Sequence, residues 1–238
     1  MTTTTKRGGN NSATRTRPKA KAVAAGVKGK AVKEKKEDGQ RKMRPVKVRQ
    51  VTLRLQSMSA YIQHQWPEKA KEMMRQKHLG KKTKTREVRD PKAEGQEAAY
   101  RTSSGEYGIP VCQIKASMIN ASHKDLGIEK TLVRKALFIE CDDVSGVIPM
   151  ECSEPVIHED PVRVGQGSAD LRYRPYFYEW GLVLTCTIDG ELLTVEDLLA
   201  LFDRAGFGVG IGEWRPEKGG EHGRFRCDPS FPVEVKEI

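Results

Sequence analysis

The amino-acid sequence predicts an α+β fold in which a mainly antiparallel sheet is combined with two or three helices. Three segments carry this prediction. Residues 180–188 (WGLVLTCTI) give the strongest strand signal of the chain, and the following Asp189–Gly190 pair ends the strand with a turn. Residues 194–205 have the apolar spacing of an amphipathic helix. In residues 48–55, apolar and polar side chains alternate as they do in a half-buried strand.

The region after the first strand is expected to form one long helix followed by a loop. Ser59 is placed to cap a helix that runs to about Leu79 with a kink at Pro67, and Gly80 ends it. The apolar side of this helix is expected to consist of Tyr61, Ile62, Trp66, Met73 and Met74. Residues 80–95 are polar and basic, which predicts a linker or mobile loop.

The middle of the chain is expected to alternate between helical and extended segments. Residues 109–122 have near-helical apolar spacing, and a proline at position 110 suits a first turn. Residues 123–132 are a polar connection. Residues 133–141 (VRKALFIEC) are predicted to form a strand, with residues 146–150 as the second arm of a hairpin.

The last third is expected to contain interrupted strands, one clear helix and two closing strands. Residues 156–164 and 169–173 are predicted as edge or irregular strands, because prolines interrupt them at positions 155, 161 and 175. In the helix over 194–205, Thr194 and Asp197 resemble a capping box, and the buried stripe is expected to be Val195, Leu198, Leu199 and Phe202. Gly206 is expected to end the helix. Residues 224–227 and 232–235 are predicted as closing strands.

The positive charge is concentrated at the N-terminal end. The 238 residues carry a formal net charge of +10. Residues 1–50 hold 16 Lys and Arg against three acids, a net of +13, and residues 51–99 hold 11 against six, a net of +5. Residues 100–238 hold 15 against 23, a net of −8. Any binding of a polyanion is therefore expected to depend on the first hundred residues.

Residues 1–45 are predicted to form a disordered basic arm in front of a single α+β domain, residues 46–238. The arm has almost no large apolar side chains, so it cannot bury enough surface to offset the entropy of ordering. Its composition is typical of basic nucleic-acid-packing arms, and a solubilising tail is the alternative. The cations expected to contact phosphates are Lys19, Lys21, Lys35, Lys36, Arg41 and Lys42.

The five cysteines are dispersed and form no CxxC pair, which favours free thiols in a reducing compartment. Cys112, Cys141 and Cys186 lie in apolar runs and are expected to be small buried side chains. No apolar run approaches the roughly 18 residues of a membrane span, and no signal peptide is recognisable. We therefore expect a soluble cytoplasmic protein without membrane contact, located in the host cytoplasm if it is viral.

Residues 205–227 (AGFGVGIGEWRPEKGGEHGRFRC) are the most distinctive segment, with seven glycines. The predicted order is strand, helix, glycine-rich loop, strand. A phosphate-binding loop of the dinucleotide or P-loop type needs strand, glycines, helix, so that the helix N-terminus faces the phosphate. In the predicted order the glycines follow the helix, which excludes both types of phosphate-binding loop.

The same order resembles the C-terminal half of ferredoxin-like domains in the RAMP superfamily of CRISPR-associated RNA-binding proteins, where a glycine-rich loop precedes the last strand. The resemblance covers residues 180–227, and it rests on Gly208, Gly210, Gly212, Gly219, Gly220, Gly223 and Phe225. It implies a ferredoxin-like fold and RNA binding. The intervening WRPEK and the acidic body depart from the family pattern. The segment also looks like parts of uncharacterised tailed-phage proteins, which implies no activity.

Two groups of residues are candidates for nucleic-acid contact. In the glycine-rich segment, the backbone at the glycines can approach a phosphate, Trp214 can stack on a base, and charge is supplied by Arg215, Lys218, His222 and Arg224. Upstream, cations alternate with aromatics at Arg172, Tyr173, Arg174, Tyr176 and Tyr178. The alternatives are a wide hairpin whose glycines only form turns, and a half-exposed strand whose aromatics pack on the core.

Three further groups invite a catalytic interpretation. One is His158, Glu159 and Asp160, whose spacing matches no metal signature; another is Asp142, Asp143 and Glu151, a possible carboxylate cluster for a nuclease; the third is His123 and His222 as acid–base groups. Exposed turns and lone structural histidines explain the same residues. We expect no catalytic residue, no metal and no cofactor.

The first function hypothesis is a non-catalytic protein that binds RNA or single-stranded DNA, with the arm supplying affinity and the glycine-rich loop positioning the ligand. The alternative is a structural or assembly protein of a virion or multi-subunit complex, with protein partners or a homo-oligomer. A metal- or histidine-dependent nuclease ranks last.

Overall fold

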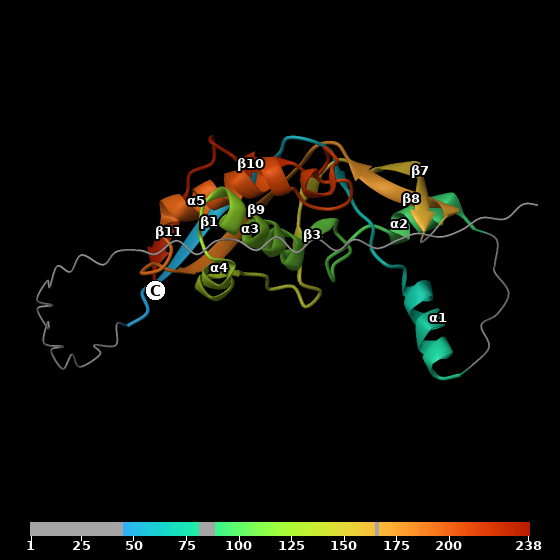
Figure 1. Cartoon of the computed structure of the whole chain (residues 1–238), viewed down its shortest axis with the longest axis horizontal. Coiled ribbons are helices and arrows are strands. Elements are labelled where there is room, and N and C mark those ends of the chain that lie inside the picture. Colours follow the sequence, from blue (N-terminus) through green and yellow to red (C-terminus); the bar gives the residue numbers. More distant parts are fainter. Residues whose placement is uncertain (1–44, 81–88, 165–166) are drawn as a thin grey trace, which may run out of the picture. The chain divides into compact units, whose positions relative to one another are not determined.

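The structure, a computed structural model of the chain, describes residues 45–80, 89–164 and 167–238 (Figure 1). The basic arm predicted for residues 1–45 lies outside this part of the chain except for its last residue. The described residues belong to one compact unit that spans residues 44–238. None of the described helices has the length and apolar character needed to cross a lipid bilayer.

The largest sheet has the strand order β10-β1-β9-β4, and its pairings are antiparallel. The strands are β1 (Val48–Ser57), β4 (Leu137–Ile139), β9 (Trp180–Asp189) and β10 (Phe225–Cys227). At the sheet's margins, β11 (Glu234–Glu237) pairs with β1, and β6 (Glu151–Cys152) pairs with β9. The strands predicted at 48–55, 180–188, 224–227 and 232–235 are therefore confirmed, with shifts of one or two residues at their ends.

Two helices complete a β-α-β-β-α-β order on this sheet (Figure 1). Helix α3 (Val111–Asp125) lies between β1 and β4 in the chain, and helix α5 (Val195–Arg204) connects β9 to the glycine-rich segment and β10. This is the ferredoxin-like order. The predicted α+β class is confirmed, although the described residues contain five α-helices instead of two or three.

The core lies between this sheet and the two helices, because alternate strand residues point to the same face. Val51, Leu53 and Leu55 of β1 are buried, and so are their partners on β9. Helix α5 begins at the predicted capping box: the Thr194 hydroxyl accepts from the Asp197 backbone N–H at 3.0 Å, and the Asp197 carboxylate accepts from the Thr194 N–H at 3.1 Å. Its buried side chains are Leu198, Leu201 and Phe202, whereas Val195 and Leu199 are only partly buried.

A second, three-stranded sheet has the order β2-β8-β7, and its strands β7 and β8 form a long hairpin. Strands β7 (Val156–Val164) and β8 (Ser168–Phe177) pair continuously. Of the two predicted alternatives, edge or irregular, β7 is an edge strand, whereas β8 is the regular central strand of its sheet. The prolines are tolerated because an antiparallel strand has positions whose N–H is not part of the ladder. Strand β2 (Tyr61–Ile62) pairs with the other edge of β8.

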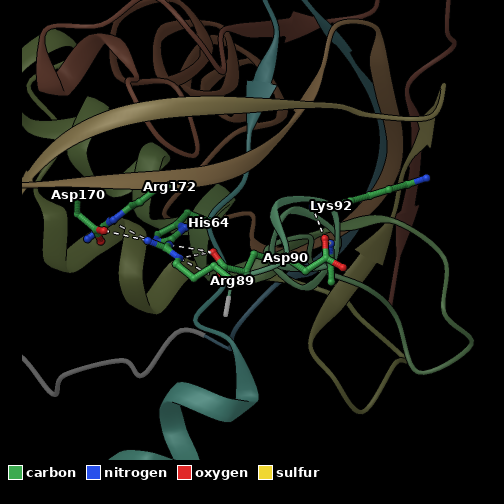
Figure 2. A network of polar contacts seen from close by, with 8 residues as sticks. His64, Arg89, Asp90, Lys92, Asp170 and Arg172 are labelled. Carbon is green, nitrogen blue, oxygen red and sulfur yellow. Dashed lines mark hydrogen bonds and ion pairs between the residues drawn. The ribbon is translucent and has the colours of Figure 1, made fainter. Parts of the chain in front are cut away.

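The hairpin carries a short helix, α2 (Pro91–Glu97), in place of the second half of the predicted loop 80–95. Asp90 caps this helix by accepting hydrogen bonds from the backbone N–H groups of its first turn (Figure 2). Arg89 then joins the helix to β8: it pairs with Glu94 at 2.8 Å and with Asp170 at 3.0 Å. These two carboxylates raise the pKa of Arg89. The rest of the predicted loop, residues 81–88, lies outside the described residues.

The long helix predicted from Ser59 to Leu79 is wrong in its first half. Tyr61 and Ile62 are buried in strand β2, and helix α1 (Glu68–His78) begins only after Pro67, which occupies its N-cap. A proline suits a helix start and interrupts a helix interior, so it sets the boundary instead of a kink. Helix α1 has no buried residue. The predicted apolar side, Trp66 with Met73 and Met74, is exposed.

The middle of the chain differs from prediction in how its short elements pair. Helix α4 (Lys130–Ala136) replaces part of the polar connection and the first half of the strand predicted at 133–141, which leaves only β4 extended. Strand β5 (Val147–Pro149) pairs with β3 (Gly108–Pro110), so the expected hairpin between β4 and β5 does not form.

The cysteine prediction holds in part. All five thiols are free. Cys186 is buried and Cys141 is half-buried, but Cys112 is exposed on the first turn of α3. An apolar run therefore did not imply burial at position 112, because a helix exposes one side of its residues even when the run contains many apolar side chains.

Candidate nucleic-acid interface

The glycine-rich segment continues helix α5 instead of stopping it. After Arg204 the backbone forms a π-helical turn, η1 (Ala205–Val209), and later a 3-10 turn, η2 (Pro216–Lys218). Gly206 is therefore not the expected stop. It is buried, and a Cβ atom there would lie 2.0 Å from the carbonyl oxygen of Phe225, so glycine allows the turn to pack directly on β10.

Most glycines of the segment are required by close packing within the segment itself. At Gly220 a Cβ atom would lie 1.8 Å from the backbone oxygen of Trp214, the one described non-glycine residue with positive φ, at 48°. The same kind of crowding or a positive φ is found at Gly206, Gly210, Gly212, Gly219 and Gly223. These glycines shape the loop, and a ligand is not needed to explain them.

Gly208 is different. Its φ is not positive, it is exposed, and an added Cβ would meet only the Asp125 carboxylate at 4.0 Å. Next to it, the Phe207 side chain is 63% exposed, and the Arg224 guanidinium lies 4.9 Å from its ring centroid. A backbone approach by a ligand is therefore sterically open at Gly208, and also at Gly219, where an added Cβ would meet nothing within 4 Å.

The structure brings the two predicted groups of aromatics and cations together. Five rings from β7, the end of β8, the residue just after it and the glycine-rich segment form a continuous series, the aromatic row: Tyr178, His158, Tyr176, His222 and Trp214. Successive ring centroids lie 6.2, 4.1, 5.8 and 6.3 Å apart. Three of the four spacings fall in the range of about 4.5–7 Å that is typical of interacting aromatic rings, and the His158–Tyr176 spacing is shorter.

The two ends of the aromatic row are exposed and its middle is buried. Trp214 is 42% exposed and Tyr178 is 53% exposed, whereas Tyr176 is 6% exposed. The Tyr178 hydroxyl lies 3.0 Å from Nε2 of His158. The buried centre fixes the row, and the exposed ends offer flat faces to a ligand.

A buried ion pair lies beneath the row. Arg174 on β8 is 2% exposed, and its guanidinium lies 3.4 Å from the carboxylate of Asp160 on β7. The Tyr176 hydroxyl donates to the same carboxylate at 3.1 Å. Burial and the Asp160 charge both raise the pKa of Tyr176, so the hydroxyl keeps its proton.

Arg174 also reaches the glycine-rich segment. Its guanidinium carbon lies 5.7 Å from the Trp214 ring centroid, within cation–π range, and its Nη2 lies 3.7 Å from the Glu213 carboxylate. Because Arg174 is buried, its place in the structure favours holding Trp214 in position over direct contact with a phosphate. The predicted direct contact by Arg174 stays untested.

The other predicted cations differ in their exposure and in whether their charged groups already have partners. Arg215 pairs with Glu217 at 2.9 Å and donates to the Gly212 carbonyl at 3.0 Å. Lys218 is exposed on the 3-10 turn. Arg224 is half-buried beside Phe207, and its Nε atom is buried without a hydrogen-bond partner among the described residues. Lys218 is therefore better placed than Arg215 for a phosphate.

Arg172 and Tyr173 lie on β8, which contacts α2. Figure 2 shows Arg172 close to His64. Arg172 donates to Nε2 of His64 at 3.2 Å, and Arg89 lies 5.7 Å from the Tyr173 ring centroid. Burial lowers the pKa of His64, and the charges of Arg172 and Arg174 lower it further, so this imidazole is neutral near pH 7.

Two of the three carboxylates considered for a nuclease, Asp143 and Glu151, have other partners. Asp143 accepts hydrogen bonds from Ser103 and Ser145, which hold its pKa well below the usual range, and Glu151 pairs with Arg54. Asp160 is bound to Arg174. In residues 45–80, 89–164 and 167–238, no group of three or more His, Cys, Asp and Glu side chains is close enough to hold a metal ion.

Sequence reasoning missed three features of this region. His158 enters the aromatic row only because β7 and β8 pair in a register that places it opposite Arg174. Phe207 is visible in the sequence as an aromatic between two glycines, and that position could have flagged it. His64 and helix α3 approach the glycine-rich segment through the tertiary fold, so no local pattern could have identified them. The arm residues from Lys19 to Lys42 lie outside the described part of the chain.

Comparison with known proteins adds little to this geometry. No protein-family model matches the chain, and no curated protein matches it. Twenty-nine chains of solved structures do match. One belongs to the "Cryo-EM structure of the Type III-B Cmr-beta bound to cognate target RNA", with 12% sequence identity and a TM-score of 0.41. The alignment covers 80% of this chain and 61% of that chain. At this TM-score the likeness says nothing about function, and the RAMP-type resemblance of residues 180–227 stays a prediction.

Proposed function

We propose that this protein binds single-stranded nucleic acid, RNA or DNA, without cleaving it. The observation that carries the proposal is the aromatic row, whose ends, Trp214 and Tyr178, are exposed, with Arg174 of the buried ion pair within cation–π range of Trp214. Single strands expose the faces of their bases, and each base stacked on an aromatic side chain contributes about 1–3 kcal/mol. Duplexes bury these faces, so the row favours single strands.

The basic arm supplies affinity that does not depend on base identity. Residues 1–50 carry a net charge of +13, while residues 100–238 carry −8. Lys and Arg side chains that neutralise phosphates release counterions, which makes binding steeply dependent on salt. In this proposal residues 46–238 act as one domain: the arm attracts the strand, and Lys218 and the aromatic row position it.

Fluorescence anisotropy with labelled 12-nucleotide single strands and matching duplexes, at several salt concentrations, tests the proposal. We expect preference for the single strand and a negative salt slope. A variant that begins at residue 45 should bind more weakly with a flatter slope, and it keeps β1, which begins at Val48. Equal affinity for duplex and single strand, or a salt slope unchanged by the deletion, would contradict the proposal.

A second candidate function, a subunit of a larger assembly, is favoured by helix α1. This helix has no buried residue, and Met73, Met74 and the neighbouring Trp66 and Leu79 are exposed. In this proposal the exposed apolar side chains form one surface that binds another protein. Light scattering without nucleic acid tests this candidate: a mass above that of the 26.7 kDa chain supports assembly, and a strictly monomeric protein speaks against self-assembly.

A further inference from the structure

A cavity of about 220 Å³ lies beside the aromatic row, between helix α3 and the glycine-rich segment. Its walls include Gln113, Ala116 and Asn120 of α3, the backbone at Gly210 and Gly212, and the side chains of His64 and Tyr100. One water needs only roughly 10–15 Å³, whereas sites for drug-sized ligands start near 300 Å³. The cavity is therefore large enough for a group the size of a small ring.

The charges of the cavity argue against a phosphate. The carboxylates of Glu213 and Glu217 both belong to its lining, and the one arginine of the lining, Arg215, already pairs with Glu217 at 2.9 Å. His64 adds no charge, because it accepts a hydrogen bond from Arg172 and is neutral. An anion would meet two carboxylates there without a free cation.

The polar groups of the cavity match the edge of a neutral heterocycle. Gln113 and Asn120 carry carboxamides, the side chains that recognise base edges, but the Asn120 amide already donates to Glu217 at 3.0 Å and accepts from Lys130 at 3.3 Å, so the contact to a base is assigned to Gln113. The Gln113 oxygen accepts from the Tyr61 hydroxyl at 2.8 Å, which fixes the orientation of this amide. Tyr100 and His64 add ring surfaces against which a base can pack.

The position of the cavity connects it to the proposed strand path. Glu213 and Arg215, the two chain neighbours of Trp214, both line it, while the Trp214 ring itself is exposed. We infer that the cavity takes up one nucleobase of the bound strand, next to a base stacked on Trp214, and that it gives the protein a base preference at that single position. This inference rests on the proposed binding of single strands.

Cys112 provides a direct probe, because it lines the cavity and is the exposed one of the five cysteines. The rate of its alkylation by iodoacetamide, followed by peptide mass spectrometry in the full chain, is measured with and without AMP, CMP, GMP or UMP. We expect one of the four to slow the reaction and to be preferred over the others by about ten-fold, the discrimination typical of a bidentate amide–base contact. Equal rates with all four and without nucleotide would overturn the inference.

A variant that fills the cavity, compared with a control variant on the same helix, is a second test of the inference. Ala116→Trp puts a large ring into the cavity from an exposed helix position, whereas His123→Trp adds the same ring to an exposed site of α3 outside the lining. Protection of Cys112 should vanish with Ala116→Trp and persist with His123→Trp, each compared with its own rate without nucleotide. Protection that survives Ala116→Trp would overturn the inference.

Anisotropy with A, C, G and U homopolymers separates this inference from the proposed function. Tight binding of all four with equal affinity and no protection of Cys112 would overturn the base cavity and leave strand binding intact. Failure of every homopolymer to bind would overturn both.

Discussion

The ferredoxin-like sheet and the β7–β8 hairpin are held by different forces. Behind the sheet lies a large apolar core to which β1, β9, α3 and α5 contribute. The hairpin reaches this core only at the end of β8, through Phe177, and its Tyr176 packs with Ala60 and Ile62 in a separate small apolar cluster. It depends instead on the buried Arg174–Asp160 pair and on the Arg89 bridges to α2.

This difference bears on function, because the aromatic row is anchored to the hairpin. An apolar core loses stability gradually when one methyl or methylene group is removed, whereas a buried ion pair fails when either partner is lost. We therefore expect the sheet to govern the stability of the whole unit and the hairpin to govern the geometry of the interface. The following predictions test whether stability depends on the sheet and interface geometry on the hairpin.

The largest effect is expected from Phe202→Ala in helix α5. Phe202 is fully buried in the core, and truncating such a side chain typically costs about 3–5 kcal/mol. The free energy of unfolding, measured by urea denaturation followed by circular dichroism, should fall by this amount. A fall below about 1 kcal/mol would show that the sheet is not the main source of stability.

The next effect is expected from Arg174→Met, which leaves the Asp160 carboxylate buried without its cation. Breaking such a pair costs about 3–5 kcal/mol, but we expect the loss to be confined largely to the hairpin. Hydrogen exchange should accelerate at the amides of β7 and β8 and change little in β1 and β9. The double variant Arg174→Met with Asp160→Leu should recover part of the protection. Equal acceleration of hydrogen exchange in both sheets would contradict the expectation that the loss is confined to the hairpin.

A smaller effect is expected from Gly220→Ala, with Gly208→Ala as its matched control. The new Cβ at position 220 would lie 1.8 Å from the Trp214 oxygen, while position 208 is open. Overpacking typically costs about 1–3 kcal/mol, so Gly220→Ala should lower the melting temperature and Gly208→Ala should not. If both alanines are tolerated equally, the close packing within the loop does not explain its glycines.

The smallest effect is expected from His64→Gln as a change in pH dependence. The pKa of His64 is lowered in the folded protein from 6.5, so below about pH 6.5 the unfolded chain binds more protons than the folded one. The free energy of unfolding of the wild type should therefore decrease as the pH falls from about 6.5 toward the folded pKa. Melting curves between pH 7 and 5 should show a shallower decrease for His64→Gln. Identical slopes would contradict a neutral, partly buried His64.

Sequence reasoning identified the elements whose signals are local. Alternation in β1, the apolar run of β9 and the capping box at Thr194 are each decided within about ten residues, and all three are confirmed. Sequence reasoning failed where strand pairing between segments far apart in the chain decides the secondary structure. Tyr61 and Ile62 became a strand because β8 offers them an edge, and β7 accommodates Pro161 because it is an edge strand, in which an N–H can lie outside the ladder.

The candidate site likewise contains residues that local sequence could identify and properties that only the fold determines. Composition singled out Trp214, His222 and the Arg–Tyr alternation on β8, and the fold brings these residues together. Composition could not show that Arg174 is buried, since that follows from Asp160 lying on the paired strand. Nor could it separate Gly208 from glycines that only relieve crowding, because the separation depends on neighbours such as Phe225, Ile62 and Pro216.

The central claim is that the exposed end of the aromatic row stacks on a base of a single strand. Its most direct test is the affinity of Trp214→Ala for a single-stranded 12-mer, measured by anisotropy at fixed salt, with Trp214→Phe as the conservative control. Loss of one stacked base, about 1–3 kcal/mol, predicts a roughly 5- to 150-fold weaker affinity for Trp214→Ala, an unchanged salt slope and substantial recovery in Trp214→Phe. Wild-type affinity in a folded Trp214→Ala variant would contradict the account.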